Sequence, residues 1–149
     1  MKSAAHNDDA RRAHRLIEAG ILLFLIGLII GLAVPAFANP RMVLSSHLES
    51  LFNGVFLVLV GLIWSRVVLS KRSKTALFWA LLYGTFANMT ATLLAAVWGA
   101  GRMMPIAAEG LEGTSVQEGI VAFLLVTLAL AMIASTILIL MGLRKGITS

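Results

Sequence analysis

Four long apolar runs dominate this sequence, and each is long enough to cross a lipid bilayer as a helix. They cover Leu16–Ala38, Leu44–Leu69, Ala76–Trp98 and Gly119–Leu143, whereas about 20 helical residues span a hydrocarbon core. None of the runs shows the period-two polarity of membrane β-barrel strands. The sequence therefore predicts an all-α, polytopic membrane protein, a four-transmembrane-helix bundle in which residues 1–149 form a single integral membrane domain.

The composition supports a membrane protein and removes several kinds of chemistry. Hydrophobic residues make up 59% of the chain and charged residues 13%, against about 45–50% and 25% in soluble domains. The chain has no cysteine, which excludes disulfide scaffolds, zinc–thiolate sites, iron–sulfur clusters and thiol catalysis.

The basic residues predict the orientation of the bundle. Ten of the twelve lie before the first run, at the connection between the second and third (including Arg66 at the end of the second run), or after the fourth, and only Arg41 and Arg102 lie in the other two loops. Because Lys and Arg stay on the cytoplasmic side, we expect both termini to be cytoplasmic and the protein to be multi-pass in the cell's inner membrane. The net charge of +5 is then a topology signal, and we expect no nucleic-acid binding.

The connections between the runs give three smaller expectations. The first run is too long for the apolar region of a signal peptide, so we interpret it as a retained span. Glu18, near the start of this span, is predicted to pair with Arg15, three residues earlier on the helix. The long glycine-rich loop from Gly99 to Glu118 is expected to be a solvated connection rather than a lid.

The second and third runs carry polar residues at helical spacing. Ser46, Glu49 and Asn53 fall at i, i+3 and i+7 on one face of the second helix, and His47, Ser50 and Gly54 repeat this spacing on the adjacent face. The third helix has the same spacing at Thr85, Asn88 and Thr92, with Tyr83, the only tyrosine, nearby. Ionisable groups inside a membrane are costly and mark functional sites, so we expect a polar pocket between these two helices.

His47 is the histidine of interest, because it lies inside a predicted span. It is suited to act as a general acid–base, as a metal ligand, or as an axial ligand of haem iron. Zinc needs three or four protein ligands, and only His47 and Glu49 are available in this half of the membrane. The residues alone leave the choice open.

Several of these residues belong to a pattern that resembles the hydroxylaminobenzene mutases. The resemblance covers most of the chain and is strongest over the first three spans. A more distant similarity is to the styrene oxide isomerases, which share a histidine followed six residues later by Asn-Gly, as in His47 and Asn53-Gly54. The segments that carry the resemblance are Ala33–Pro35, Asn39–Met42, Leu44–Glu49, Asn53–Gly54, Phe56–Leu57, Tyr83–Asn88 and Trp98–Gly101.

The resemblance implies a redox-neutral membrane isomerase that converts arylhydroxylamines to 2-aminophenols. It also implies a homotrimer with haem b near the subunit boundary, in which His47 is the axial ligand and the ferric iron acts as a Lewis acid. Asn53 would orient the substrate, and Asn88 would lie in the substrate pocket. The styrene oxide branch has an aspartate and a tyrosine where Gly84 and Thr92 stand here.

The residues themselves leave the role of each site open. Without haem, Glu49 or His47 is available as the general acid. Tyr83, Thr85 and Thr92 are further candidates for the substrate pocket. Two other functions remain at this point: a small multidrug or cation transporter that uses Glu49, and a non-catalytic scaffold. Glu49→Gln would abolish transport, whereas His47→Ala would abolish isomerisation.

Overall fold

The computed structural model describes residues 2–37 and 39–148, and this part of the chain is helical with no β-strand. Four helices, α1 (Lys2–Ala33), α2 (Pro40–Ile63), α3 (Lys71–Trp98) and α5 (Ser115–Thr148), are long and apolar enough to cross a membrane. The one-turn α4 (Pro105–Ala108) lies between α3 and α5. Two short 3₁₀ turns, η1 (Val34–Ala36) and η2 (Trp64–Arg66), extend α1 and α2. The predicted all-α fold with four spans is confirmed.

The helices begin earlier than the apolar runs, and the second run ends later than its helix. The predicted second span reaches Leu69, but helical structure stops at Arg66. Val67 is fully buried, and the backbone N–H of Val68 donates to the carbonyl of Gly142 on α5 at 3.1 Å. The predicted span therefore included a segment that is not part of the helix, because its apolar residues pack against α5. The predicted end of the first span, Ala38, lies outside the described residues.

Local signals set the helix ends. Asn39 caps α2 by accepting a hydrogen bond from the backbone N–H of Met42, and Pro40 occupies the first turn, where its missing N–H costs nothing. Ser70 caps α3 in the same way, accepting from the N–H of Ser73. Gly99 ends α3 in a left-handed conformation with φ of 68°, which glycine adopts without strain. These caps fix where each polar residue of α2 and α3 lies along the bundle.

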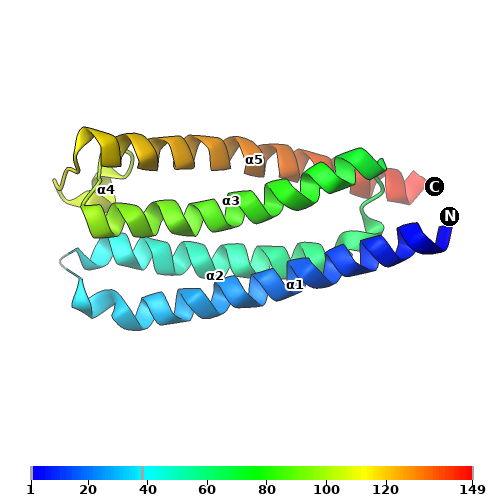
Figure 1. Ribbon diagram of the computed structural model, residues 1–149, viewed down its shortest axis with the longest axis horizontal. Helices are drawn as coiled ribbons and strands as arrows, with labels where there is room; N and C mark the ends of the chain where they lie inside the picture. Colours follow the sequence, from blue (N-terminus) through cyan, green and yellow to red (C-terminus); the bar gives the residue numbers. More distant parts are fainter. Residues whose placement is uncertain (1, 38, 149) are drawn as a thin grey trace.

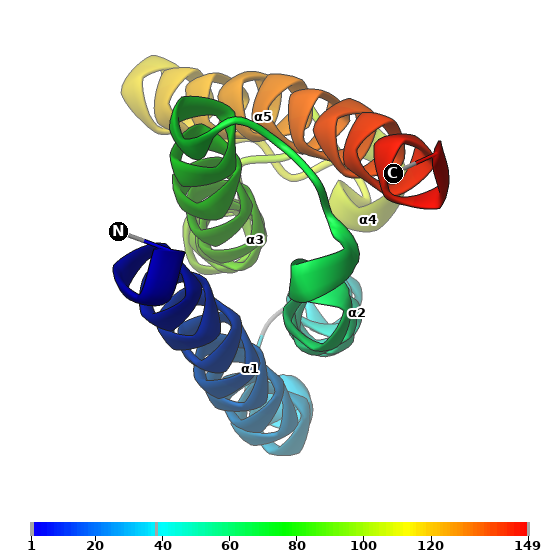
Figure 2. The same ribbon diagram turned by 90° about the vertical axis from the view of Figure 1, so that its right-hand side faces the viewer.

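The four long helices run side by side in an elongated bundle. The N- and C-termini lie at one end, here called the terminal end, and the α1–α2 turn and α4 lie at the other, here called the loop end (Figure 1). Seen along the bundle, α1 packs on α2, α2 on α3, and α3 on α5, so that α1 and α5 are the outer helices (Figure 2). The two central helices, α2 and α3, are the ones that carry the polar residues.

Glycines bring α1 and α2 into close contact. A methyl group added at Gly54 would lie 2.7 Å from the carbonyl oxygen of Gly20, and one added at Gly20 would lie 2.6 Å from that of Gly54. Gly61 and Gly27 make similar approaches to the opposite helix. Small residues allow such backbone contact between membrane helices. The expectation that Gly54 admits a close neighbour is confirmed, and the neighbour is α1.

The terminal end is held by polar contacts between α1 and α3. Lys74 is buried, donates to Asp9 at 2.7 Å and lies 5.5 Å from the ring centre of Trp64. Arg12 donates to the hydroxyl of Thr75 at 2.8 Å. These contacts explain why α1 continues as a helix before the predicted span. Glu18 pairs with His14 at 3.1 Å, one full turn away, so the predicted partner Arg15 was wrong.

Candidate functional site

Glu49 is the centre of the polar cluster between α2 and α3. Its Oε2 accepts a hydrogen bond from Nδ2 of Asn88 on α3 at 2.7 Å and a longer one from Nδ2 of Asn53 at 3.5 Å. Asn53 lies one turn from Glu49 on α2 and is 8% exposed, whereas Glu49 and Asn88 are half-buried. No hydrogen bond from any described residue reaches the second carboxylate oxygen, Oε1. The predicted polar pocket between these helices is confirmed in its central contact.

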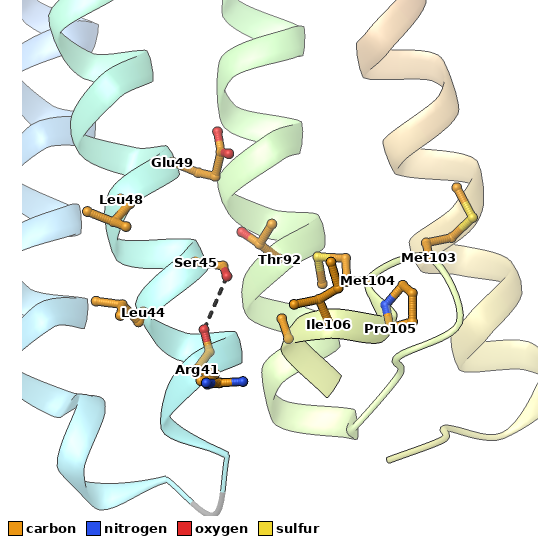
Figure 3. Close-up of a pocket in the computed structure, with 11 residues that line it drawn as sticks. Arg41, Leu44, Ser45, Leu48, Glu49, Thr92, Met103, Met104, Pro105 and Ile106 are labelled. Atoms are coloured by element: carbon orange, nitrogen blue, oxygen red, sulfur yellow. Dashed lines mark hydrogen bonds between the residues drawn. The ribbon is translucent and has the colours of Figure 1, made fainter. Parts of the chain in front are cut away.

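A cavity of about 620 Å³ opens beside this cluster at the loop end of the bundle, and we call it the roofed cavity. Glu49 and Thr92 lie at its inner end, and Leu44 and Leu48 of α2 line one wall (Figure 3). Residues 103–107, in and next to α4, line its loop-end side and are called the roof, while the cavity itself remains open. The full lining is Arg41, Leu44, Ser45, Leu48, Glu49, Thr92, Met103, Met104, Pro105, Ile106 and Ala107.

The roof was not expected from the sequence, which predicted a solvated connection. Asn39 holds the roof at one side, since its Nδ2 donates to the carbonyls of Ala107 at 2.9 Å and Ala108 at 3.1 Å. Arg41 pairs with Glu109 at 3.1 Å on the surface. The sequence feature that could have indicated the roof is Met-Met-Pro-Ile within a polar loop. A group of exposed apolar residues marks a binding or interaction surface.

His47 lies on a different face of α2 from Glu49. Two helical positions correspond to about 200° of rotation, and the imidazole points to α1, where Nδ1 lies 2.7 Å from the carbonyl oxygen of Gly27. A methyl group at Gly31 would come within 2.6 Å of the same nitrogen. His47 also lines a separate groove of about 450 Å³, called the histidine groove, with Leu28, Gly31, Leu32, Val34, Pro35 and Leu44.

The hydrogen bond fixes the state of this imidazole. A carbonyl oxygen only accepts hydrogen bonds, so Nδ1 must carry the proton, and the lone pair of a neutral ring is then on Nε2. This is the arrangement by which proteins orient a histidine that ligates a metal through its other nitrogen. Within the described residues, no three His, Cys, Asp or Glu side chains lie close enough to hold a metal ion. A ligand held by one histidine fits this site, whereas a zinc ion held by side chains alone does not.

The remaining polar candidates divide between the cavity and the helix packing. Thr92 lines the roofed cavity, and its hydroxyl donates to the carbonyl of Asn88. Thr85 is fully buried and donates to the carbonyl of Leu81 on its own helix. Tyr83 is 42% exposed, lines none of the cavities described here, and its hydroxyl lies 2.6 Å from that of Thr127 on α5. The structure thus brings Glu49, Asn53, Asn88 and Thr92 together and places Tyr83 and Thr85 elsewhere.

Comparisons with known proteins show the family of the chain. The styrene oxide isomerase family matches residues 12–144. The chain is 53% identical to hydroxylaminobenzene mutase HabB of Ectopseudomonas oleovorans over 93% of this chain and 85% of the relative. It is 44% identical to hydroxylaminobenzene mutase HabA of the same organism over 87% of this chain and 97% of the relative. No solved structure gives a significant match.

Both relatives are named as mutases, which are isomerases, and the matches include α1, α2, α3 and most of α5. This selects isomerase among the three functions that the sequence left open. It also places the Glu49–Asn88 cluster and His47 within the matched region. The chain belongs to the styrene oxide isomerase family, and within it to the hydroxylaminobenzene mutases, as an all-helical membrane isomerase.

Proposed function

We propose that this protein converts arylhydroxylamines such as hydroxylaminobenzene to 2-aminophenols. The observation that supports this most directly is the 53% identity to a protein named hydroxylaminobenzene mutase over 93% of the chain. In this reaction the N–O bond breaks, a C–O bond forms at the ortho carbon, and the proton displaced from that carbon ends on nitrogen. No electrons are gained or lost overall, so the reaction needs no external oxidant or reductant.

The roofed cavity has the chemistry that such a substrate requires. Its apolar walls, Leu44, Leu48 and the roof, suit an aromatic ring, and its polar end offers Glu49. The free Oε1 of Glu49 can accept the N–H or O–H of the hydroxylamine, while Asn88 holds Oε2 at 2.7 Å. We propose that Glu49 takes up the proton displaced from the ortho carbon and delivers it to the product nitrogen. Asn53 and Asn88 orient this carboxylate and the substrate.

The cavity also accounts for water exclusion. Cleavage of the N–O bond leaves an electron-poor ring that bulk water would capture at any open position. A mostly apolar lining limits this side reaction and favours transfer of the original oxygen to the neighbouring carbon. Arylhydroxylamines are small and apolar enough to enter a bilayer, which raises their concentration around a membrane enzyme.

We further propose that His47 is the axial ligand of a haem b. The supporting observations are the Nδ1 hydrogen bond to Gly27, which leaves the Nε2 lone pair available, and the apolar histidine groove beside the ring. A ferric haem held there would supply a Lewis acid for the hydroxylamine oxygen. Gly31 leaves room for the imidazole against α1, and the carbonyl of Gly27 holds Nδ1, so that the orientation of the ring is fixed before any ligand binds.

His47 and Glu49 lie on different faces of α2, and we propose that a homotrimer in the inner membrane brings the two sites together. His47 faces α1 and Glu49 faces α3, with the exposed residues Leu44, Leu48 and Phe52 between them. Leu44 lines both the roofed cavity and the histidine groove. A neighbouring copy on this face would cover both openings, so that His47 of one copy and Glu49 of the next act at one substrate.

The test is turnover by the purified protein. We expect phenylhydroxylamine, incubated under argon with the protein in mild detergent, to give 2-aminophenol by chromatography, and the product to disappear with Glu49→Gln and with His47→Ala. Haem is tested separately: the Soret absorption band should be lost in His47→Ala and kept in Glu49→Gln. Folded wild-type protein that makes no 2-aminophenol would contradict the proposed reaction, and active protein without a Soret band would contradict the haem.

A further inference from the structure

Glu118 has an unusual position for a carboxylate in this protein. It lies in the first turn of α5 and is only 2% exposed. Its Oε1 accepts hydrogen bonds from the backbone N–H groups of Gly101 and Gly113, both at 3.0 Å, and its Oε2 accepts one from the N–H of Arg102 at 3.2 Å. One side chain therefore gathers both ends of the loop that connects α3 and α5. A carboxylate suits this task, because both of its oxygens only accept.

The bonded segment leads directly into the roof. Arg102 precedes Met103, the first roof residue, and the roof ends at Ala107, where Asn39 donates to the carbonyl at 2.9 Å. The roof is thus anchored at its beginning by Glu118 and at its end by Asn39. Its own hydrogen bonds are short-range turns, such as Met104 N–H to the carbonyl of Gly101 at 2.9 Å, and these do not tie it to the helices.

The packing beneath these anchors leaves the roof little freedom. A methyl group added at Gly101 would collide with Cβ of Ala108 and with the carbonyl oxygen of Leu111. Ala100 and Ala108 are buried in the same cluster. Loss of the Glu118 contacts would therefore displace the whole segment rather than one side chain, and would change the position of the roof beside Thr92 (Figure 3).

We propose that Glu118 is a positioning residue for the isomerase reaction: without touching the substrate, it holds the roof at the height that closes the cavity over an aryl ring. The role in turnover rests on the proposed function, whereas the role in holding the roof does not. Glu118→Gln replaces one acceptor oxygen by an NH₂ group that would face a backbone N–H donor. The roof should then lift, water should enter, and the apolar ring should bind more weakly.

The absence of cysteine from the natural sequence allows a direct test of roof position. Ser45 lines the roofed cavity, so Ser45→Cys gives a protein with a single thiol beneath the roof. We would measure its labelling by a sulfonated, water-soluble maleimide in nanodiscs, alone and combined with Glu118→Gln. The matched control is Glu112→Gln, which removes an exposed carboxylate from the same loop.

We expect Glu118→Gln to speed labelling by about tenfold or more, the change that loss of one hydrogen bond to a charged group would give, and Glu112→Gln to leave it unchanged. With phenylhydroxylamine and otherwise wild-type protein, Glu118→Gln should raise KM by a similar factor and change kcat less. Glu118→Asp keeps the charge but shortens the side chain, and should give intermediate values of both. It also provides the measurement if Glu118→Gln does not fold.

The outcomes separate this inference from the proposed function. Labelling rates and KM that are the same in the Glu118 variants as in Glu112→Gln would overturn the inference. A labelling rate that rises with Glu118→Gln, in a protein that makes no 2-aminophenol even as wild type, would establish the anchoring and contradict only the substrate. A fall in kcat with unchanged KM and labelling would instead mean that Glu118 acts in the chemistry, which also overturns the inference.

Discussion

Glu49 and Asn88 form the strongest polar contact between α2 and α3, with 2.7 Å between Oε2 and Nδ2. Asn53 reaches the same oxygen only at 3.5 Å, the outer limit of a hydrogen bond. The two asparagines are thus unequal partners of the carboxylate. Asn88 sets its orientation across the helix interface, while Asn53 lies beside it on the same helix.

This inequality predicts a ranking of variants. We expect Asn88→Ala to lower kcat/KM for phenylhydroxylamine by about tenfold or more, since each 1.4 kcal/mol of lost stabilisation is a factor of ten, and Asn53→Ala to have a smaller effect. Steady-state kinetics of both proteins in the same detergent measures this. An effect of Asn53→Ala equal to or larger than that of Asn88→Ala would mean that Asn53 contacts the substrate directly.

Tyr83 permits a second residue-level prediction. Its hydroxyl lies 2.6 Å from that of Thr127 on α5, and the residue is not part of the roofed cavity. Tyr83→Phe should therefore change kcat/KM by less than about threefold, because a polar contact this exposed contributes little. A large loss of turnover in Tyr83→Phe would show that the exposed face of α3 and α5 takes part in the reaction, for instance through a neighbouring copy.

Among the elements, the packing of α1 on α2 depends most on glycine at particular positions. Gly54→Ala would place a methyl group 2.7 Å from the carbonyl oxygen of Gly20, whereas Gly119 on α5 has no described heavy atom within 4 Å. We expect Gly54→Ala to destabilise the protein by about 1–3 kcal/mol through overpacking. Gly119→Ala should be neutral or stabilising by up to about 1 kcal/mol, from helix propensity. Thermal unfolding in detergent, followed by circular dichroism, compares the two; equal melting temperatures would contradict the close helix contact.

The elements also show what the sequence could predict. Four spans followed from the length of the apolar runs, and a polar pocket between α2 and α3 followed from their matching i, i+3, i+7 patterns. The patterns did not predict that Glu49 and Asn88 are the residues in contact. The same periodicity could not show that His47 faces α1, because periodicity gives the angle between two residues and not the identity of the neighbouring helix. Gly31 decides this by leaving room for the imidazole, and Gly27 by offering its carbonyl oxygen to Nδ1.

The roof was missed for a different reason. Its anchors are hydrogen bonds from side chains to backbone groups, Glu118 to Gly101, Arg102 and Gly113, and Asn39 to Ala107 and Ala108. Backbone groups are present at every position, so a sequence does not show which of them a side chain will bind. Glu118 therefore looked like one more acidic residue of a solvated loop, whereas the structure buries it.

At the scale of the whole molecule, the order α1–α2–α3–α5 leaves α2 with one face uncovered by its own chain. The exposed residues of this face include Phe52, which is 71% exposed, and Leu62, which is 65% exposed. The roofed cavity and the histidine groove open on either side of the same face, with Leu44 common to both. A second copy that packs here would form a heterologous contact, which closes into a ring when it repeats with the right rotation.

The proposed trimer leads to expected results that a monomer would not give. Native mass spectrometry in mild detergent should give three times the chain mass of 15.9 kDa. His47→Ala and Asn88→Ala proteins, each with strongly reduced turnover alone, should regain activity when co-expressed. In randomly mixed rings about a quarter of the contacts would join an intact His47 to an intact Asn88 of the next copy. Mixing the two proteins after separate purification is the control, since assembled rings would not exchange. A trimer whose co-expressed variants stay inactive would mean that each chain holds a complete site, and the divergence of His47 and Glu49 around α2 would then exclude one of them from the reaction.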